Sequence, residues 1–145
     1  MKPTILLRVA SILTLIHAVL HTIGAVFGKP KNGSDEVAVL ETMKAHQFLV
    51  MGSSRTYWDF FFGYGLILSI CLLVEAVLFW QLGEIAKSQP KLIRPILAAF
   101  ILAFCGTALI AGRYFFLGPT ITEVLIAGCL AGAYVTAGAK RVAGS

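Results

Sequence analysis

The stretch from Phe60 to Leu82, FFFGYGLILSICLLVEAVLFWQL, decides the class of fold. It contains one charged residue, Glu75, and it is long enough to cross a bilayer, which takes about 20 mostly apolar residues in a helix. Tyr57 and Trp58 precede it and Trp80 lies near its end, as is typical of aromatic belts at the two membrane interfaces. We therefore predict a membrane-spanning helix over about residues 55–84.

Three further stretches have the same character. The chain has 145 residues, of which 58% are hydrophobic and 13% charged, whereas soluble domains carry roughly a quarter charged residues. The remaining spans are predicted at about residues 3–27, 92–117 and 120–139, and Thr120 and Glu123 match a capping box for the last one.

The segment of residues 34–51 is too polar to span the bilayer. Ser34 is a suitable helix cap, and apolar residues follow it at helical spacing, which predicts a short helix lying at the membrane surface. The predicted fold is therefore all-α: a single domain, residues 1–145, formed by an integral membrane four-helix bundle with a short amphipathic helix between the first and second spans.

Charge and cysteine usage exclude several classes of function. The net charge is +5, but no basic patch is interleaved with aromatic residues, so we expect no nucleic-acid partner and interpret the charge as topological. The predicted spans place seven of the twelve basic residues on the side of the membrane that holds both termini, which predicts that this side is cytoplasmic. These residues are Lys2, Arg8, Lys87, Lys91, Arg94, Lys140 and Arg141. The three cysteines are isolated, and the absence of C-x-x-C argues against disulfide exchange.

Small residues mark the expected helix contacts, because helices associate in lipid by close packing. One stripe of the first span holds Ala10, Thr14, His17, His21, Gly24 and Gly28. Gly128 and Gly132 form a G-x-x-x-G pattern in the fourth span.

The candidate binding residues gather at the predicted outer mouth of the bundle. They are His17, His21, His46, Arg55, Asp59 and Arg113. Three interpretations stay open: a hydrogen-bonded polar plug in which an arginine pairs with Asp59, a small-molecule site in which arginines bind an anionic group, and a metal or haem site using His17, His21 and His46. No cofactor is assigned.

Glu75 lies deep in the second span. An unpaired charge there is costly, so we expect a buried ion pair between Arg8 and Glu75. The alternative is that Glu75 is neutral and takes part in proton chemistry.

The string Ser54-Arg55-Thr56-Tyr57-Trp58-Asp59-Phe60 resembles a motif of an uncharacterised family of small bacterial membrane proteins with four spans. The resemblance extends to Arg8, His21, His46 and the Arg113-Tyr114-Phe115-Phe116 run, and covers nearly the whole chain. It implies a bacterial inner-membrane protein and supplies no reaction.

The favoured function is a bacterial inner-membrane protein with a polar pocket near the outer face that binds a small amphipathic or anionic ligand. One alternative is a membrane enzyme that acts on a lipid, quinone or isoprenoid, with a histidine and Asp59 as acid–base pair. Another is a structural subunit of a larger membrane complex, or a homo-oligomer, with or without bound haem or metal.

Overall fold

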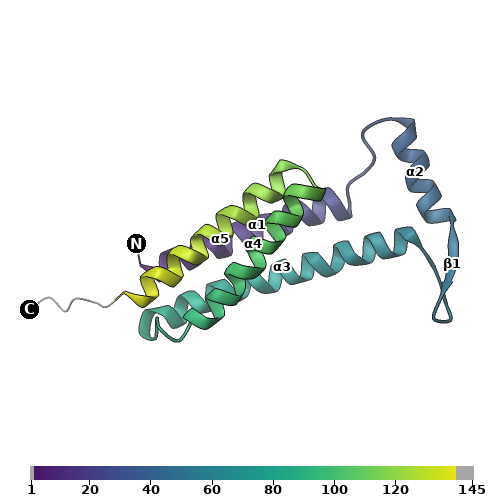
Figure 1. Ribbon diagram of the computed structural model, residues 1–145. Coiled ribbons are helices and arrows are strands. Elements are labelled where there is room, and N and C mark those ends of the chain that lie inside the picture. The colour runs from purple at the N-terminus through teal and green to yellow at the C-terminus, as the bar shows by residue number, and fades with distance from the viewer. Residues whose placement is uncertain (1, 140–145) are drawn as a thin grey trace, which may run out of the picture. The chain divides into compact units, whose positions relative to one another are not determined.

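The computed structural model describes residues 2–139, and helices dominate it (Figure 1). Among the described residues, four helical segments are long and apolar enough to cross a membrane. The first joins α1 (Pro3–His21) to a π-helical segment, η1 (Thr22–Val26). The others are α3 (Tyr57–Ser88), α4 (Arg94–Tyr114) and α5 (Leu117–Gly138). The predicted all-α membrane fold is confirmed.

The fourth span begins earlier than predicted, and its expected capping box is wrong. Because α5 begins at Leu117, Thr120 lies inside the helix, where its hydroxyl faces the Phe116 carbonyl at 3.5 Å. The Glu123 carboxylate instead accepts a hydrogen bond from Thr107 on α4. Pro119 lies within the first turn of α5, where a missing N–H costs little.

The predicted surface helix over residues 34–51 is shorter than expected. It is α2 (Ser34–Ala45), it buries no residue, and an antiparallel hairpin of β1 (Gln47–Val50) and β2 (Ser53–Thr56) follows it. Met51 and Gly52 make the turn with φ values of 48° and 83°. A two-residue hairpin turn needs positive φ at both positions to match the strand twist, and glycine meets that need without strain.

The chain forms two compact units. The bundle unit consists of residues 1–17 and 72–145, and the cap unit consists of residues 18–71. Both α1 and α3 contribute to each unit.

The bundle unit buries one stripe of each of its four helices. Within it, α4 and α5 pack side by side along most of their length (Figure 1). Phe79 of α3 is fully buried and meets Phe100 of α4 edge to face, with ring centroids 4.9 Å apart. A methyl group on Gly132 of α5 would lie 3.2 Å from Leu6 of α1, so this glycine permits a close helix contact. Gly128, the other half of the G-x-x-x-G pattern, has open space beside it.

Polar contacts join α1 to α3 within the bundle unit. The Ser11 hydroxyl donates a 2.7 Å hydrogen bond to the Ala76 carbonyl. Arg8 forms an ion pair with Glu84, and its guanidinium stacks 3.3 Å above the centre of the Trp80 ring. Lys87 also pairs with Glu84, at 2.5 Å. A shared network therefore fixes the end of the bundle unit at which α1 begins and α3 ends.

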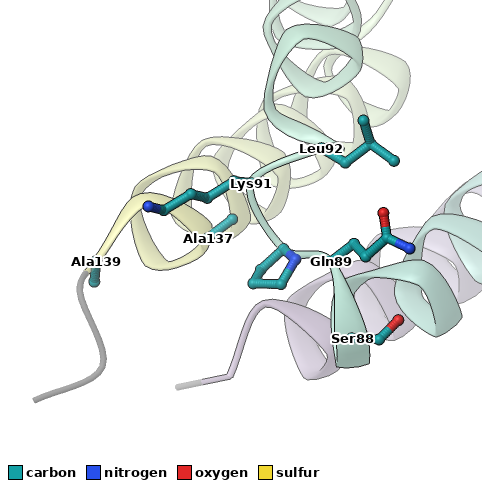
Figure 2. A pocket seen from close by; sticks show the side chains of 7 residues that line it. Ser88, Gln89, Lys91, Leu92, Ala137 and Ala139 are labelled. Carbon is teal, nitrogen blue, oxygen red and sulfur yellow. The ribbon is translucent and has the colours of Figure 1, made fainter. Parts of the chain in front are cut away.

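An open hollow of about 790 Å³ lies at this same end, between the α3–α4 loop and the end of α5 (Figure 2). Its lining is Ser88, Gln89, Pro90, Lys91, Leu92, Ala137 and Ala139. The Lys91 side chain reaches across toward α5 (Figure 2). Lys140 and Arg141, which support the predicted topology, lie outside the described residues.

The cap unit is held by contacts between the end of the first span and the beginning of α3. The Thr22 hydroxyl donates to the Ser69 hydroxyl at 2.8 Å. Val26 is buried, and a methyl group on Gly65 would lie 3.0 Å from its side chain. Phe27 meets Phe62 edge to face at 5.8 Å. Gly24 of the predicted small-residue stripe is exposed and makes no such contact.

Candidate functional site

Asp59, a candidate ligand-binding residue, caps the N-terminus of α3. Its carboxylate accepts a hydrogen bond from the Thr56 backbone N–H at 2.8 Å, and the Thr56 hydroxyl accepts one from the Asp59 backbone N–H at 3.1 Å. This reciprocal pair is a capping box, which satisfies two N–H groups that the helix leaves open at its start. A carboxylate there also complements the positive end of the helix dipole.

Arg55 does not pair with Asp59. It belongs to β2 rather than to α3, so it does not lie one helical turn before Asp59. Its guanidinium donates to the Ser54 carbonyl at 2.7 Å, the side chain is exposed, and the ion pairs of the described residues do not include it.

The histidines of the cap unit have partners within that unit. His46 follows the last residue of α2, and its ring stacks on Tyr57 with centroids 6.2 Å apart. The His21 ring nitrogen Nε2 lies 3.1 Å from the Gly65 carbonyl oxygen. Since a carbonyl only accepts, Nε2 carries the hydrogen in this contact.

Arg113 belongs to the bundle unit, at the last turn of α4. It is exposed, and its guanidinium lies 5.6 Å from the centre of the Tyr114 ring. Its predicted meeting with His21 and Asp59, which are residues of the cap unit, stays a prediction.

The buried ion pair predicted between Arg8 and Glu75 is wrong, because Arg8 pairs with Glu84. The cause is depth. Arg8 lies ~8 Å along α1 from Pro3, whereas Glu75 lies ~20 Å along α3 from Ser88, at the same end of the bundle unit. Glu84, near the end of α3, is level with Arg8.

A different polar cluster forms inside the bundle unit, and Glu123 of α5 is its centre. Only 7% of Glu123 is exposed. The Thr107 hydroxyl of α4 donates to one carboxylate oxygen at 2.6 Å. His17 Nδ1 of α1 lies 3.3 Å from the other oxygen. We call His17, Thr107, Glu123 and Glu75 the carboxyl cluster.

Glu75 completes the carboxyl cluster from α3. It is half-buried on the inward stripe of that helix, between the buried residues Leu72 and Ala76. Each of the four spanning helices therefore contributes one residue. Two carboxyl groups within electrostatic reach of each other cannot both stay ionised at low cost in a low-dielectric surrounding.

The four members lie at one level of the span. His17 is ~21 Å along α1 from Pro3, and Glu75 is ~20 Å back along α3 from Ser88. Thr107 is ~20 Å along α4 from Arg94, and Glu123 is ~9 Å from the first residue of α5. With a hydrocarbon core about 30 Å thick, the cluster lies inside the membrane, nearer to the α4–α5 turn.

The sequence predicts part of this cluster. His17 belongs to the small-residue stripe of the first span, and Glu75 is an isolated charge within the second. Glu123 matches a capping box in the sequence, and Thr107 has no distinguishing pattern around it. The available signal was the spacing of Glu123 with Ile126, Ala127 and Leu130, which places Glu123 on the buried face of α5.

The described residues contain no group of three or more His, Cys, Asp or Glu side chains arranged to hold a metal ion. His17, His21 and His46 are therefore not brought together as a metal site. Cys71 and Cys105 are exposed and Cys129 is half-buried, all as free thiols.

Comparisons with protein-family models, with curated proteins and with solved structures found no match. The fold and the site define a multi-pass membrane protein with a carboxyl cluster within its span.

Proposed function

We propose that this protein binds a small lipophilic cation in exchange for a proton at the carboxyl cluster. The observation that carries the proposal is the placement of Glu123, which is buried at membrane depth and contacts side chains of two other helices. Ionisable residues within a span are costly and mark substrate, ion or proton pathways.

The charge of the cluster favours a cation over the anionic ligand expected from the sequence. It contains two carboxyl groups and one histidine, and the ion pairs of the described residues bring no arginine or lysine to it. A proton and a cation then compete for the same carboxylates. The bilayer surroundings favour ligands that are amphipathic, with apolar groups around the charge.

The members have different roles in this proposal. Glu75 and Glu123 hold the exchangeable proton. When His17 is protonated, its positive charge neutralises that of a carboxylate. Thr107 orients Glu123 through its 2.6 Å hydrogen bond. Loss of the proton creates the negative charge that attracts the cation.

The proposal includes a location. The resemblance supports a bacterial inner membrane, and the basic residues Lys2, Lys87 and Lys91 support cytoplasmic termini. The carboxyl cluster then lies nearer to the periplasmic side. Single cysteines at Asn32 and Ser88, in a background without native cysteines, are expected to label from the periplasm and the cytoplasm respectively. Labelling of Ser88→Cys from outside intact cells would contradict this orientation.

The test uses the purified full chain in detergent with tetraphenylphosphonium as the probe. Calorimetric titration in two buffers with different protonation enthalpies counts the protons released for each cation bound. We expect proton release and an affinity that increases with pH, because deprotonation makes the carboxylate available. Glu123→Gln and Glu75→Gln should each weaken binding at least tenfold.

Glu41→Gln is the matched control, because Glu41 lies on exposed α2 and pairs only with nearby Lys44 among the ion pairs of the described residues. It should bind as the unmodified protein does. Binding without proton release, unchanged binding by Glu123→Gln, or no binding at any pH would each overturn the proposal.

A second candidate function is recognition of an anionic group at the end where α3 begins. The specific observation is that Arg55 is exposed and has no carboxylate partner among the described residues, since Asp59 is occupied by its capping box. Inorganic phosphate that binds the unmodified protein but not Arg55→Gln, in a calorimetric titration, would support it, and equal binding to both would reject it.

A further inference from the structure

The hairpin of β1 and β2 has two chemically different faces. Opposite residues of an antiparallel pair point to the same side, and successive residues alternate. The register therefore places Phe48, Val50 and Arg55 on one face. Gln47, Leu49 and Ser54 occupy the other face, where the Ser54 hydroxyl lies 3.3 Å from the Gln47 side-chain oxygen.

The first face is turned toward the membrane-spanning part of α3. The Phe48 ring lies 4.7 Å from that of Tyr57 and 6.0 Å from that of Phe60, between centroids. Phe60 in turn lies 6.4 Å from Tyr64, one turn further into the span. Phe48 thus begins an aromatic column that continues along α3 into the bilayer.

The hairpin is joined directly to the spanning helix α3. β2 ends at Thr56 and α3 begins at Tyr57, so no linker separates the hairpin from the spanning helix. The Thr56–Asp59 capping box fixes this junction. Figure 1 shows the hairpin running across the direction of α3 at its beginning. A hairpin that runs across a spanning helix is oriented along the membrane plane when that helix crosses the bilayer.

We propose that the hairpin lies flat on the bilayer surface, with Phe48 and Val50 facing the acyl-chain boundary and Arg55 among the lipid phosphates. The partner is the phospholipid headgroup layer of the leaflet in which α3 begins. Val50 shares its face with Phe48, which packs on the beginning of α3, whereas Leu49 lies on the opposite face. Arg55 donates a hydrogen bond to the Ser54 carbonyl, and its guanidinium has further N–H groups for phosphate.

Tip residues are suited to the same layer. Met51 is fully exposed at the turn, and Met51 and Gly52 fix a tight bend that keeps the tip narrow. An apolar tip with tyrosine and arginine beside it is the composition found where proteins meet the membrane interface.

The experiment compares two neighbouring positions on opposite faces of β1. In a background with Cys71, Cys105 and Cys129 replaced, Val50→Cys and Leu49→Cys are each labelled with an environment-sensitive fluorophore. The labelled full chain is placed in nanodiscs of phosphatidylethanolamine and phosphatidylglycerol. Quenching is measured with nitroxide-labelled lipid and, separately, with aqueous iodide.

We expect the Val50 label to be quenched at least threefold more by nitroxide lipid than the Leu49 label, with the reverse order for iodide. Arg55→Gln should reduce the lipid quenching at Val50, whereas Ser54→Ala, on the other face, should leave it unchanged. Equal, aqueous behaviour of both labels would overturn the proposal. A Leu49 label deeper than the Val50 label would also overturn it, because the opposite face would then contact lipid.

Discussion

Charged side chains have different kinds of partner in the two units of this protein. In the cap unit most charged side chains with contacts satisfy local groups: Asp59 caps α3 together with Thr56, and Glu36 binds the loop before α2. Its contacts between helices, Thr22 with Ser69 and His21 with the Gly65 carbonyl, involve no carboxyl group. In the bundle unit the carboxyl cluster joins side chains from different helices inside the membrane. Local polar contacts in water are readily replaced, whereas buried contacts in lipid have no alternative partner, so the second set is the better guide to function.

The largest expected effect is on the free energy of unfolding, and it should come from substitutions in the bundle unit, which contains the apolar core. Phe79→Ala removes a fully buried ring and its edge-to-face contact with Phe100, which should cost about 3–5 kcal/mol. Unfolding by sodium dodecyl sulfate, followed by circular dichroism, measures this. Phe116→Ala is the control, since that ring is 73% exposed and its loss should cost little. Equal losses would mean that the core assignment is wrong.

The next effect concerns the cap unit. Thr56→Ala and Asp59→Ala each remove one half of the capping box and should cost about 1 kcal/mol. The double variant should cost less than the sum of the two, because the two hydrogen bonds act together. Unfolding free energies from the same denaturation assay test this cycle, with Ser54→Ala as the control.

Strict additivity of the two capping variants would show that the contacts are independent. A loss of tetraphenylphosphonium binding in Asp59→Ala that exceeds its loss in Glu123→Gln would reverse the comparison of the units, because it would move the ligand site to the cap unit.

The sequence predicted the class of fold because hydrophobic length is read directly from residues. It failed where local geometry decides. The sequence pattern predicts a surface helix through residue 51 and a span that begins at Arg55, but the Met51-Gly52 turn folds residues 47–56 into a hairpin. Arg55 therefore belongs to β2, while Asp59 belongs to α3. The predicted pair of Arg8 with Glu75 is wrong because α1 and α3 run antiparallel. The rise of each residue along the two helices brings Arg8 to the level of Glu84.

The candidate site was harder to predict for a physical reason. Its members are far apart in sequence, and a threonine hydroxyl in a helix ordinarily bonds its own backbone, as Thr14 does with the Ala10 carbonyl. The Thr107 hydroxyl also lies 3.2 Å from the Ala103 carbonyl and 3.1 Å from the Phe104 carbonyl of its own helix, in addition to its 2.6 Å contact with Glu123. The packing of α4 on α5, which a single sequence does not show, brings the Thr107 hydroxyl to Glu123. The motif around Trp58 attracts attention in the sequence, but the structure uses Thr56 and Asp59 of that motif to begin a helix.

A smaller effect is expected at Thr107. Thr107→Val keeps the shape and removes the hydroxyl that donates to Glu123, and hydrogen bonds between membrane helices are worth about 0.6 kcal/mol on average. We expect a two- to threefold loss of tetraphenylphosphonium affinity, and Thr107→Ser should restore it. Thr122→Val is the control, because the Thr122 hydroxyl donates to the Gly118 carbonyl of its own helix. A loss in Thr107→Ser as large as in Thr107→Val would assign the effect to packing.

The smallest effect concerns Glu36, outside the spans. Its carboxylate accepts hydrogen bonds from the backbone N–H groups of Asn32 at 2.7 Å and Lys31 at 2.8 Å, and these lower the pKa of Glu36 below its ordinary value, Asn32 most strongly. Because the folded pKa is depressed, the stabilisation is present above the ordinary value and is lost as pH falls through the folded pKa. The amide resonances of Lys31 and Asn32 should therefore shift together in the NMR spectrum at acid pH.

Glu36→Gln is the control that isolates this titration. Its side chain keeps an oxygen that accepts hydrogen bonds but carries no charge, so the two amide resonances should no longer change with the Glu36 midpoint. Because Glu36 lies outside the spans and bonds only backbone groups of the preceding loop in these contacts, the change should stay local to the loop before α2, and the resonances of α4 and α5 should not move with it. A midpoint at or above the ordinary value for glutamate would contradict the loop contacts. A coupled shift in the bundle unit would instead show that a surface contact of the cap unit reaches the carboxyl cluster.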